Sequence, residues 1–502
     1  MGCEKMSRQD NTKTITIIGG GLSGLTVFYE QVKAYQSAPQ DAPDLHINWI
    51  EKSGNFGAGI AYNADDDVFL LNQPAKLMSP FADDPQHFTR WLEKNDPGSD
   101  EDSFVPRRLY RRYLDELLND ALETAKQSGG KLKTSLISAA ADDLTPQQNG
   151  SYRITLKSGL TLGSDAVILA TGHLLNRDWQ HLRGAPHYQQ SPFHKADIAR
   201  EVNTATGNIG IIGTGQSMMD CLAALEAIGT KEKIYLFSRD NILPWEFDPK
   251  KFGDDTPRYE LQYLTPENIS ADSDFNVLKN NFAKEIKNAA AGGFTLGHVL
   301  TGFDKQGFLK AAAHHPKGGD IRKFTGLIDK YYANPTTPER FRLFQKLQKN
   351  GQVEIIRQEI NADSLRQDAD GGFTIGGKVK IAHLFNSAAL GRSAFDKNGL
   401  PVDKLARAAD SAGALARHPK DKASIRPGLQ NRAGLYVTGP QTNATRWGVE
   451  TFREHSRDAA REALSYVLTL PATTNNQSNN QENRKENNHV KDRKISAGTH
   501  GI

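Results

Sequence analysis

Residues 14–30 read TITIIGGGLSGLTVFYE, and this stretch decides the fold of the 502-residue chain. The apolar run that ends at Ile18 is typical of a buried strand, and the apolar positions after Gly24 have helical spacing. Between them, Gly19, Gly21 and Gly24 occupy the three glycine positions of G-x-G-x-x-G. A strand, this turn and a helix in that order form a dinucleotide-binding fingerprint. The glycines allow a tight turn, a close approach of the pyrophosphate to the backbone, and close packing of helix on strand.

An acidic residue follows where this pattern expects one. Residues 45–51 read LHINWIE, which predicts a second strand that ends in Glu51. The spacing from Gly24 exceeds the roughly 20 residues that are usual, and the polar residues 37–44 account for the excess as an inserted loop. We expect Glu51 to accept hydrogen bonds from the adenosine ribose hydroxyls. A chance glycine turn in a structural βαβ unit is the disfavoured alternative.

Composition narrows the class of protein. The chain is long enough for two or three domains, and its formal net charge of +3 gives no case for a nucleic-acid or membrane partner. The N-terminus lacks the apolar core of a signal peptide, so a cytoplasmic protein is expected. Cys3 and Cys221 are the two cysteines, and they form neither a C-x-x-C motif nor a metal cluster. We therefore predict no dithiol chemistry and no metal site.

A second unit of the same kind begins near residue 208. The strand IGII at residues 209–212 leads into Gly213-Thr214-Gly215, although Met218 holds the third glycine position. The next strand ends in Ser238-Arg239, and a hydroxyl with a guanidinium suits a 2′-phosphate that a carboxylate would repel. This favours NADPH, with NADH as the alternative donor and a solvated surface arginine as the alternative interpretation. The predicted site consists of Gly213, Gly215, Ser217, Ser238 and Arg239.

Two nucleotide units suggest two cofactors, with FAD on the first unit and NADPH on the second. A strand over residues 165–169 leads to Ala-Thr-Gly and His173, and another over 434–438 ends at Gly439. In flavoproteins with two dinucleotide-binding domains, the late strand returns the chain to the flavin. The N-terminus of the next helix, with its partial positive charge, then points at the flavin ring. Gly439 is therefore counted with the FAD site.

The predicted fold class is α/β, with two dinucleotide-binding, Rossmann-like domains. An FAD domain covers residues 14–200, and an NAD(P)H domain covers 201–380 with a mainly helical insertion at about 245–352. Residues 381–470 return to complete the FAD domain. Residues 471–502 are polar and almost empty of apolar residues, so they are expected to be a disordered tail.

Four short motifs are specific in combination, although each is short. They are GAGIAY at residues 57–62, LLNQP at 70–74, FVPRRLY at 104–110 and ATGH at 170–173. With the two glycine turns, they resemble the bacterial FAD/NAD(P)-binding proteins related to flavin-containing N-hydroxylating monooxygenases. Known members include amino-acid N-hydroxylases and a urate hydroxylase. The resemblance covers most of residues 14–470 and implies FAD, an NAD(P)H donor and the two-domain fold. The late strand ends in Gly439-Pro440-Gln441, where many flavoproteins have Gly-Asp, so Gln441 or a backbone group would have to substitute for the aspartate.

Several residues near the predicted flavin are candidate site residues, and some of them also have a purely structural interpretation. Asn72 and Gln73 could hydrogen-bond the flavin edge or the substrate, or Asn72 could cap its own backbone turn. His173, at a strand end, is a proton donor or a structural histidine. Trp447 is expected close to the ring without a proton role. No residue is assigned a catalytic role.

Three functions remain open from the sequence. The first is an NAD(P)H-using monooxygenase that hydroxylates a small polar substrate with oxygen through a C4a-hydroperoxyflavin. The second is a flavin-dependent reductase or dehydrogenase that passes electrons to a carrier or organic acceptor. The third is a flavin-bound sensor or scaffold with little turnover. The substrate and the oligomeric state do not follow from the sequence.

Overall fold

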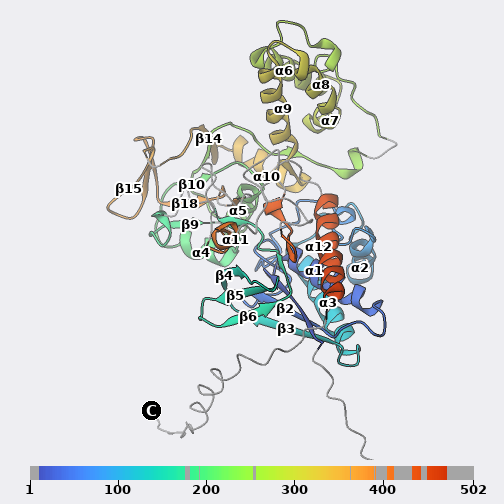
Figure 1. The fold of residues 1–502 in the computed structure, drawn as a ribbon. Coiled ribbons are helices and arrows are strands. Elements are labelled where there is room, and N and C mark those ends of the chain that lie inside the picture. Colours follow the sequence, from blue (N-terminus) through green and yellow to red (C-terminus); the bar gives the residue numbers. More distant parts are fainter. Residues whose placement is uncertain are drawn as a thin grey trace, which may run out of the picture.

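The computed structural model describes residues 11–175, 181–190, 193–252, 256–361, 363–388, 390–391, 404–411, 432–442 and 449–471. Figure 1 shows two α/β bodies side by side and a helical lobe that projects from the second. The predicted α/β class with two parallel, Rossmann-like sheets is confirmed. None of the described helices is long and apolar enough to cross a membrane.

The first body is built on a five-stranded parallel sheet in the order β20-β7-β1-β2-β3. Its strands are β1 (Lys13–Ile18), β2 (Leu45–Glu51), β3 (Leu132–Ser138), β7 (Ala166–Leu169) and β20 (Leu435–Val437). Three helices pack on one face: α1 (Leu22–Gln36), α3 (Arg107–Lys126) and α12 (Val449–Thr469). An antiparallel sheet packs on the other face: β4 (Ala141–Pro146), β5 (Tyr152–Leu156) and β6 (Thr161–Ser164). The short α2 (His87–Asn95) lies beside α3.

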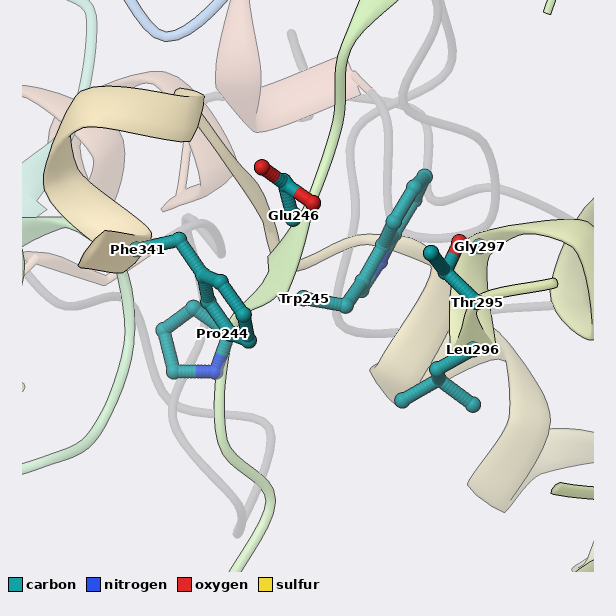
Figure 2. Close-up of a pocket in the computed structure, with 7 residues that line it drawn as sticks. All are labelled: Pro244, Trp245, Glu246, Thr295, Leu296, Gly297 and Phe341. Carbon is teal, nitrogen blue, oxygen red and sulfur yellow. The ribbon is translucent and has the colours of Figure 1, made fainter. Parts of the chain in front are cut away.

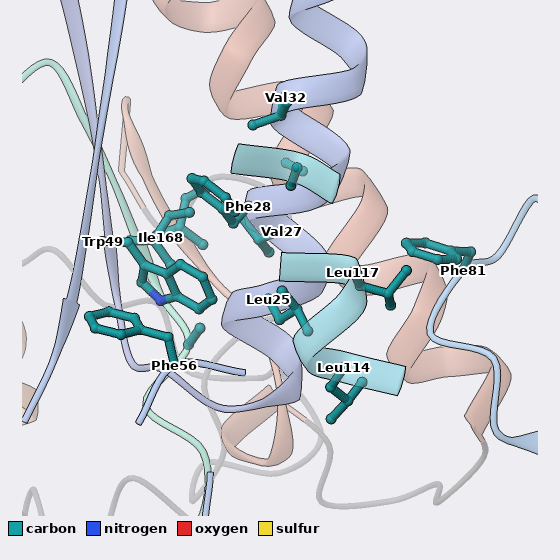
Figure 3. Close-up of a cluster of buried hydrophobic side chains, with 14 of the residues drawn as sticks. Leu25, Val27, Phe28, Val32, Trp49, Phe56, Phe81, Leu114, Leu117 and Ile168 are labelled. Atoms are coloured by element: carbon teal, nitrogen blue, oxygen red, sulfur yellow. The ribbon is translucent and has the colours of Figure 1, made fainter. Parts of the chain in front are cut away.

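A continuous apolar core fixes α1 against this sheet. Ile15 and Ile17 of β1 are completely buried, as the β-branched run predicts. The rings of Phe28 and Trp49 stack at 5.0 Å, and Figure 3 shows Trp49 and Phe56 packed beside α1, which carries Phe28. The Trp49 indole N–H also donates to the Gly19 carbonyl at 2.9 Å, so the core positions the glycine turn itself.

The second body has a five-stranded parallel sheet in the order β14-β11-β10-β18-β9. Its strands are β9 (Tyr188–Gln190), β10 (Ile209–Ile212), β11 (Ile234–Ser238), β14 (Val353–Arg357) and β18 (His383–Asn386). The accompanying helices are α4 (Lys195–Val202), α5 (Gln216–Ile228) and α10 (Pro338–Lys349), whereas α11 (Lys404–Ser411) packs against β4 of the first body. A small antiparallel sheet, β15 (Leu365–Gln367), β16 (Phe373–Ile375) and β17 (Val379–Ile381), lies at one edge.

The predicted helical insertion is present. It contains α6 (Phe275–Ala291), α7 (Leu296–Thr301), α8 (Lys305–His314) and α9 (Gly318–Tyr332), which enclose their own aromatic core. Its neck is the parallel pair β12 (Trp245–Glu246) and β13 (Pro335–Thr336). Asp274 and Asp304 cap α6 and α8 with their carboxylates, as short polar side chains at these positions should.

The predicted domain boundaries assign two strands to the FAD domain, whereas the structure places both strands in the second body. β9 falls before residue 200 and β18 after residue 381, yet both pair in the second sheet, with β18 directly beside β10. Parallel strands pair with partners far away in sequence, so local patterns do not reveal which sheet a strand joins. The short antiparallel pair β8 (Leu174–Leu175) and β19 (Leu390–Gly391) marks the passage between the bodies. The predicted tail from residue 472 onward lies outside the described residues.

Candidate cofactor and substrate site

In the first glycine turn, a side chain would clash at two of the positions where the fingerprint requires glycine. Gly19 has a φ of +115°, and a Cβ there would lie 2.3 Å from the Ala170 oxygen. A Cβ on Gly24 would lie 2.1 Å from the Gly19 oxygen, so α1 rests directly on the turn. At Gly21 a Cβ would meet only the Cα of Gly59 at 3.6 Å, which leaves that side open.

The start of α1 is suited to a phosphate. Gly21 is its N-cap residue and supplies no side-chain hydrogen bond, so the N–H groups of the first turn are left for another acceptor. Free N–H groups and the helix dipole together favour an anion at this point. The turn therefore fits the pyrophosphate of a dinucleotide such as FAD.

Glu51 lies at the edge of this turn. Its Oε2 accepts a hydrogen bond from Gly20 N at 2.7 Å, and its Oε1 accepts one from Ser53 N at 2.9 Å. The side chain is partly exposed. Its Oε1 also accepts from the Ser53 Oγ at 2.8 Å, so Oε2 is the oxygen that can accept a further hydrogen bond. The structure thus places Glu51 where a ribose next to the pyrophosphate could reach it.

The late strand returns to the first turn. Gly439 follows β20 with a φ of +89°, and a Cβ on it would lie 2.9 Å from the Ser23 Oγ in the first turn of α1. The neighbouring Thr438 N donates to the Leu169 carbonyl at 2.9 Å. Gly439 therefore lies beside the first turn of α1. Trp447 and Arg446 lie outside the described residues.

The second turn repeats this design at β10 and α5. Gly213 has a φ of +94°, and Gly215 is the N-cap residue of α5 without a side-chain cap. The atom nearest to a Cβ on Gly215 is the Asn334 Oδ1 at 3.9 Å, so the helix start is open, with Ser217 in its first turn. Met218, at the third glycine position, is completely buried in the core of the second body.

The two predicted NADPH ligands at the end of β11 differ in their exposure to solvent. Ser238 is 9% exposed, and its hydroxyl contacts the Thr214 Oγ1 at 3.0 Å and accepts from Asn241 N at 3.1 Å. The Arg239 side chain is 61% exposed, and within the described part of the chain its ionic contacts are long ones, to the carboxylates of Asp240 at 3.3 Å and Glu359 at 3.5 Å. Ser238 is thus engaged inside the protein, whereas the Arg239 guanidinium is accessible.

Residues 57–79 run from the first turn to the second body. Gly59 lies against Gly21, and Phe69 is fully buried in the core that surrounds β10 and α5. Three side chains fix the far end of this segment by donating to its carbonyl oxygens: Arg107 to Leu70 at 3.0 Å, Tyr110 to Met78 at 2.7 Å and Arg453 to Leu77 at 2.8 Å. The loop is therefore held rigidly between the two glycine turns.

Asn72 and Gln73 lie on this loop. Asn72 is exposed and Gln73 is half-buried, and neither side chain forms a hydrogen bond with another described residue. The turn-capping alternative for Asn72 is thus not seen in the described part of the chain. Met78 is 7% exposed and packs in the core of the first body. Two amides on a fixed backbone remain available to a ligand.

A buried charge cluster, which the sequence did not reveal, joins the two bodies. The Arg107 Nη2 of α3 donates to the Asp220 Oδ2 of α5 at 2.7 Å, and the two residues are 8% and 5% exposed. Burial raises the pKa of Asp220, while Arg107 and Arg340 act to lower it. The adjacent Arg108 is instead half-exposed and lies 3.7 Å from Asp67. One of the two arginines is thus a solvated helix residue, and the other ties the bodies together.

Two further residues complete the survey. His173 is half-buried and follows the left-handed Gly172 at the carboxyl end of β7, the edge where ligands bind in α/β sheets. Cys221 is fully buried, and burial raises the pKa of its thiol well above the ordinary value. A protonated, enclosed thiol is unreactive, which argues against a redox role for Cys221.

A small pocket lies at the neck of the helical lobe (Figure 2). Trp245 and Glu246 of β12 line it together with residues 295–297 at the start of α7 and Phe341 of α10. Its volume of about 100 Å³ is well below the roughly 300 Å³ of the smallest ordinary ligand sites. It marks the joint between lobe and sheet and is not a dinucleotide site.

Two parallel sheets with a glycine turn each define an FAD/NAD(P)-binding oxidoreductase fold. Residues 16–174 match the sequence model of a family described as FAD-NAD(P)-binding, which confirms the resemblance for this region. The description of that model names FAD and NAD(P) as the bound cofactors. No protein of curated function matches the sequence significantly.

Two solved structures support the fold at low sequence identity, and a third is less similar. The reduced ornithine hydroxylase of Pseudomonas aeruginosa superimposes with a TM-score of 0.53 at 12% identity, over 91% of this chain and 100% of that one. The L-lysine 6-monooxygenase of Pseudomonas syringae gives 0.50 at 13% identity, over 92% and 100%. A bacillithiol disulfide reductase of Staphylococcus aureus gives 0.46 at 14% identity, over 91% and 99%. These similarities concern the fold alone.

Proposed function

We propose that the protein is an FAD-dependent, NADPH-using monooxygenase that hydroxylates a small polar substrate. The observation that carries this proposal is the pair of open, uncapped glycine turns, with a rigid loop between them that presents two unpaired amides. FAD bound at the first turn would accept hydride from NADPH and activate oxygen. The chain itself would bind, orient and enclose the reactants.

Each part of the site has a role in this proposal. The α1 N-terminus at Gly21 would bind the FAD pyrophosphate, and Glu51 would accept hydrogen bonds from the ribose. Asn72 and Gln73 would orient the flavin edge or the substrate, since an amide both donates and accepts hydrogen bonds. Polar recognition of this type suits a small hydrophilic substrate.

The cysteines favour oxygen chemistry over dithiol chemistry. The chain has Cys3 and Cys221 alone, so a C-x-x-C pair does not exist. Cys221 is enclosed beneath the second sheet, where burial raises the pKa of its thiol. A reductase would therefore need an acceptor that takes electrons from the flavin directly.

Arg239 is the residue that we assign to the 2′-phosphate of NADPH. Its guanidinium is accessible at the end of β11, and its contacts with Asp240 and Glu359 are long enough for a phosphate to replace them. Ser238 would then support the end of the strand and would not bind the cofactor. We expect Arg239→Ala to raise KM for NADPH about tenfold or more, while KM for NADH stays within about twofold. Arg366→Ala is the control, because this arginine of β15 is also mainly exposed, at 78% against 61% for Arg239.

The proposal is tested by a substrate screen under ¹⁸O₂. The purified protein is loaded with FAD and supplied with NADPH and small amines, amino acids and purines, and products are analysed by mass. We expect one substrate class to stimulate NADPH oxidation and to gain one ¹⁸O atom. NADPH oxidation that yields only hydrogen peroxide, or that reduces an added acceptor without oxygen incorporation, would favour the reductase instead.

Loop variants connect this chemistry to the structure. With the substrate that the screen identifies, Asn72→Ala and Gln73→Ala are expected to lower the fraction of NADPH oxidation that is coupled to product. Asn280→Ala, on the exposed surface of α6, is the control and should leave coupling unchanged. Unchanged coupling in both loop variants would remove this loop from the substrate site.

A further inference from the structure

Two histidines and a glutamate lie close together at the end of the second sheet that is opposite to its glycine turn. His383 is the first residue of β18, His187 immediately precedes β9, and Glu201 lies in the last turn of α4. Because Tyr188 pairs with Leu384, the two histidines are neighbours across the parallel strands. One ligand atom from each of the three residues lies within 4.8 Å of the others.

The polar atoms of this cluster are arranged as cation ligands. The His383 Nε2 faces the Ala205 carbonyl at 2.8 Å, so this nitrogen carries the proton and Nδ1 presents a lone pair. That Nδ1 is buried, has no hydrogen-bond partner among the described residues, and lies 3.6 Å from the Glu201 Oε1. A buried acceptor nitrogen that faces a carboxylate is stabilised by a positive charge between or beside them, either a proton or a metal ion.

The second histidine is directed at the same carboxylate. The His187 Nδ1 lies 3.2 Å from the Glu201 Oε1, and its ring centre is 5.2 Å from that of His383. The backbone of His187 is left-handed, with a φ of +58°, and its carbonyl accepts from Leu384 N at 2.8 Å. An uncommon backbone conformation that the sheet enforces thus turns this ring toward Glu201.

We propose that His187, Glu201 and His383 bind a divalent transition-metal ion, with zinc as the best match. Two imidazoles and a carboxylate are zinc ligands, at about 2.0–2.2 Å each. Tetrahedral ligands at that length are about 3.3 Å apart, close to the observed separations of 3.2 and 3.6 Å. His187 and Glu201 are 19% and 23% exposed, which leaves room for a water molecule as the fourth ligand.

The location indicates a structural ion. In a parallel sheet the dinucleotide turns follow the carboxyl ends of the strands, whereas this cluster lies at the amino ends of β9 and β18. Four residues of β10 separate the two edges, which is about 13 Å. The ion would join β9, α4 and β18, and it would not touch either cofactor. The proposal is therefore independent of the proposed function.

Zinc titration of the full-length protein tests the site. The protein is stripped of metal with a chelator and titrated with zinc chloride in a calorimeter. We expect one tight site per chain, and we expect Glu201→Gln and His187→Gln to weaken it on the order of 100-fold. His314→Gln changes an exposed histidine of α8 and should bind zinc like the wild type. The circular dichroism of each metal-free variant shows whether it folds.

X-ray absorption at the zinc edge gives a readout that needs no variant. The wild-type complex should show two imidazoles and further oxygen ligands at about 2.0–2.2 Å, without sulfur. The absence of a saturable zinc site at micromolar concentrations would overturn the proposal. Zinc binding that is unchanged in folded Glu201→Gln and His187→Gln variants would overturn it as well.

Discussion

Removal of the Arg107 side chain should cost the protein a large part of its stability. In Arg107→Met the Asp220 carboxylate stays 95% buried after its closest cationic partner, 2.7 Å away, has gone. Breaking a buried ion pair on one side typically costs about 3–5 kcal/mol. Because Arg340 still faces Asp220, we expect the lower end of this range, about 3 kcal/mol. Arg108→Ala, which removes an exposed neighbour with a 3.7 Å contact, should cost less than about 1 kcal/mol.

The loss in Arg107→Met should depend on pH in a defined direction. Burial already raises the pKa of Asp220, and the loss of Arg107 removes a charge that acts to lower it. A carboxyl group with a raised pKa contributes stability at low pH that disappears as the pH rises through its folded-state pKa. The stability deficit of the variant should therefore be smaller at pH 5 than at pH 8.

Urea unfolding at both pH values measures this effect, with tryptophan fluorescence and circular dichroism followed together. The double variant Arg107→Met/Asp220→Leu should recover most of the lost stability, because it leaves no buried charge unpaired. An Arg107→Met loss no larger than that of Arg108→Ala would refute the reasoning. A deficit that grows toward low pH would refute it too.

Four further predictions concern packing and burial. Gly24→Ala puts a carbon 2.1 Å from the Gly19 oxygen, so it should lower the bound FAD per chain and cost at least about 1–3 kcal/mol. The same change at Gly326 of α9, where space is open, should instead stabilise by about 0.4–1 kcal/mol. The Cys221 thiol should escape Ellman's reagent until the protein unfolds, because it is buried and its pKa is raised. Glu285→Ala leaves the N–H groups of residues 262–264 without their acceptor, so proteolysis of the helical lobe should quicken.

The parts of the fold that could be predicted depend on local sequence. The strand, glycine turn and helix are contiguous at Gly19–Gly24 and again at Gly213–Gly215, and each appears where the pattern predicts it. Residues 245–352 likewise show their own helical periodicity. Residues 245–336 of this stretch form the helical lobe and its neck, whereas α10 packs in the core of the second body. The steric need for glycine at Gly19 and Gly24 agrees with the roles that the pattern gives them.

The parts that could not be predicted depend on contacts between distant segments. Asp220 lies in α5 and Arg107 in α3, and no sequence pattern shows that an ion pair joins them. The cluster of His187, Glu201 and His383 has no metal-ligand spacing, because strand pairing brings its members together. The buried state of Ser238 also escaped prediction, since it depends on the folded position of the Thr214 hydroxyl.

The central claim is that the first glycine turn holds FAD and the second presents NADPH to it. The most direct test is an anaerobic absorption measurement on the protein purified with, or reconstituted with, FAD. The account predicts one bound flavin per chain and rapid loss of its visible absorbance on addition of NADPH, with a slower response to NADH. A folded protein that binds no FAD, or a bound flavin that neither nicotinamide reduces, would contradict it.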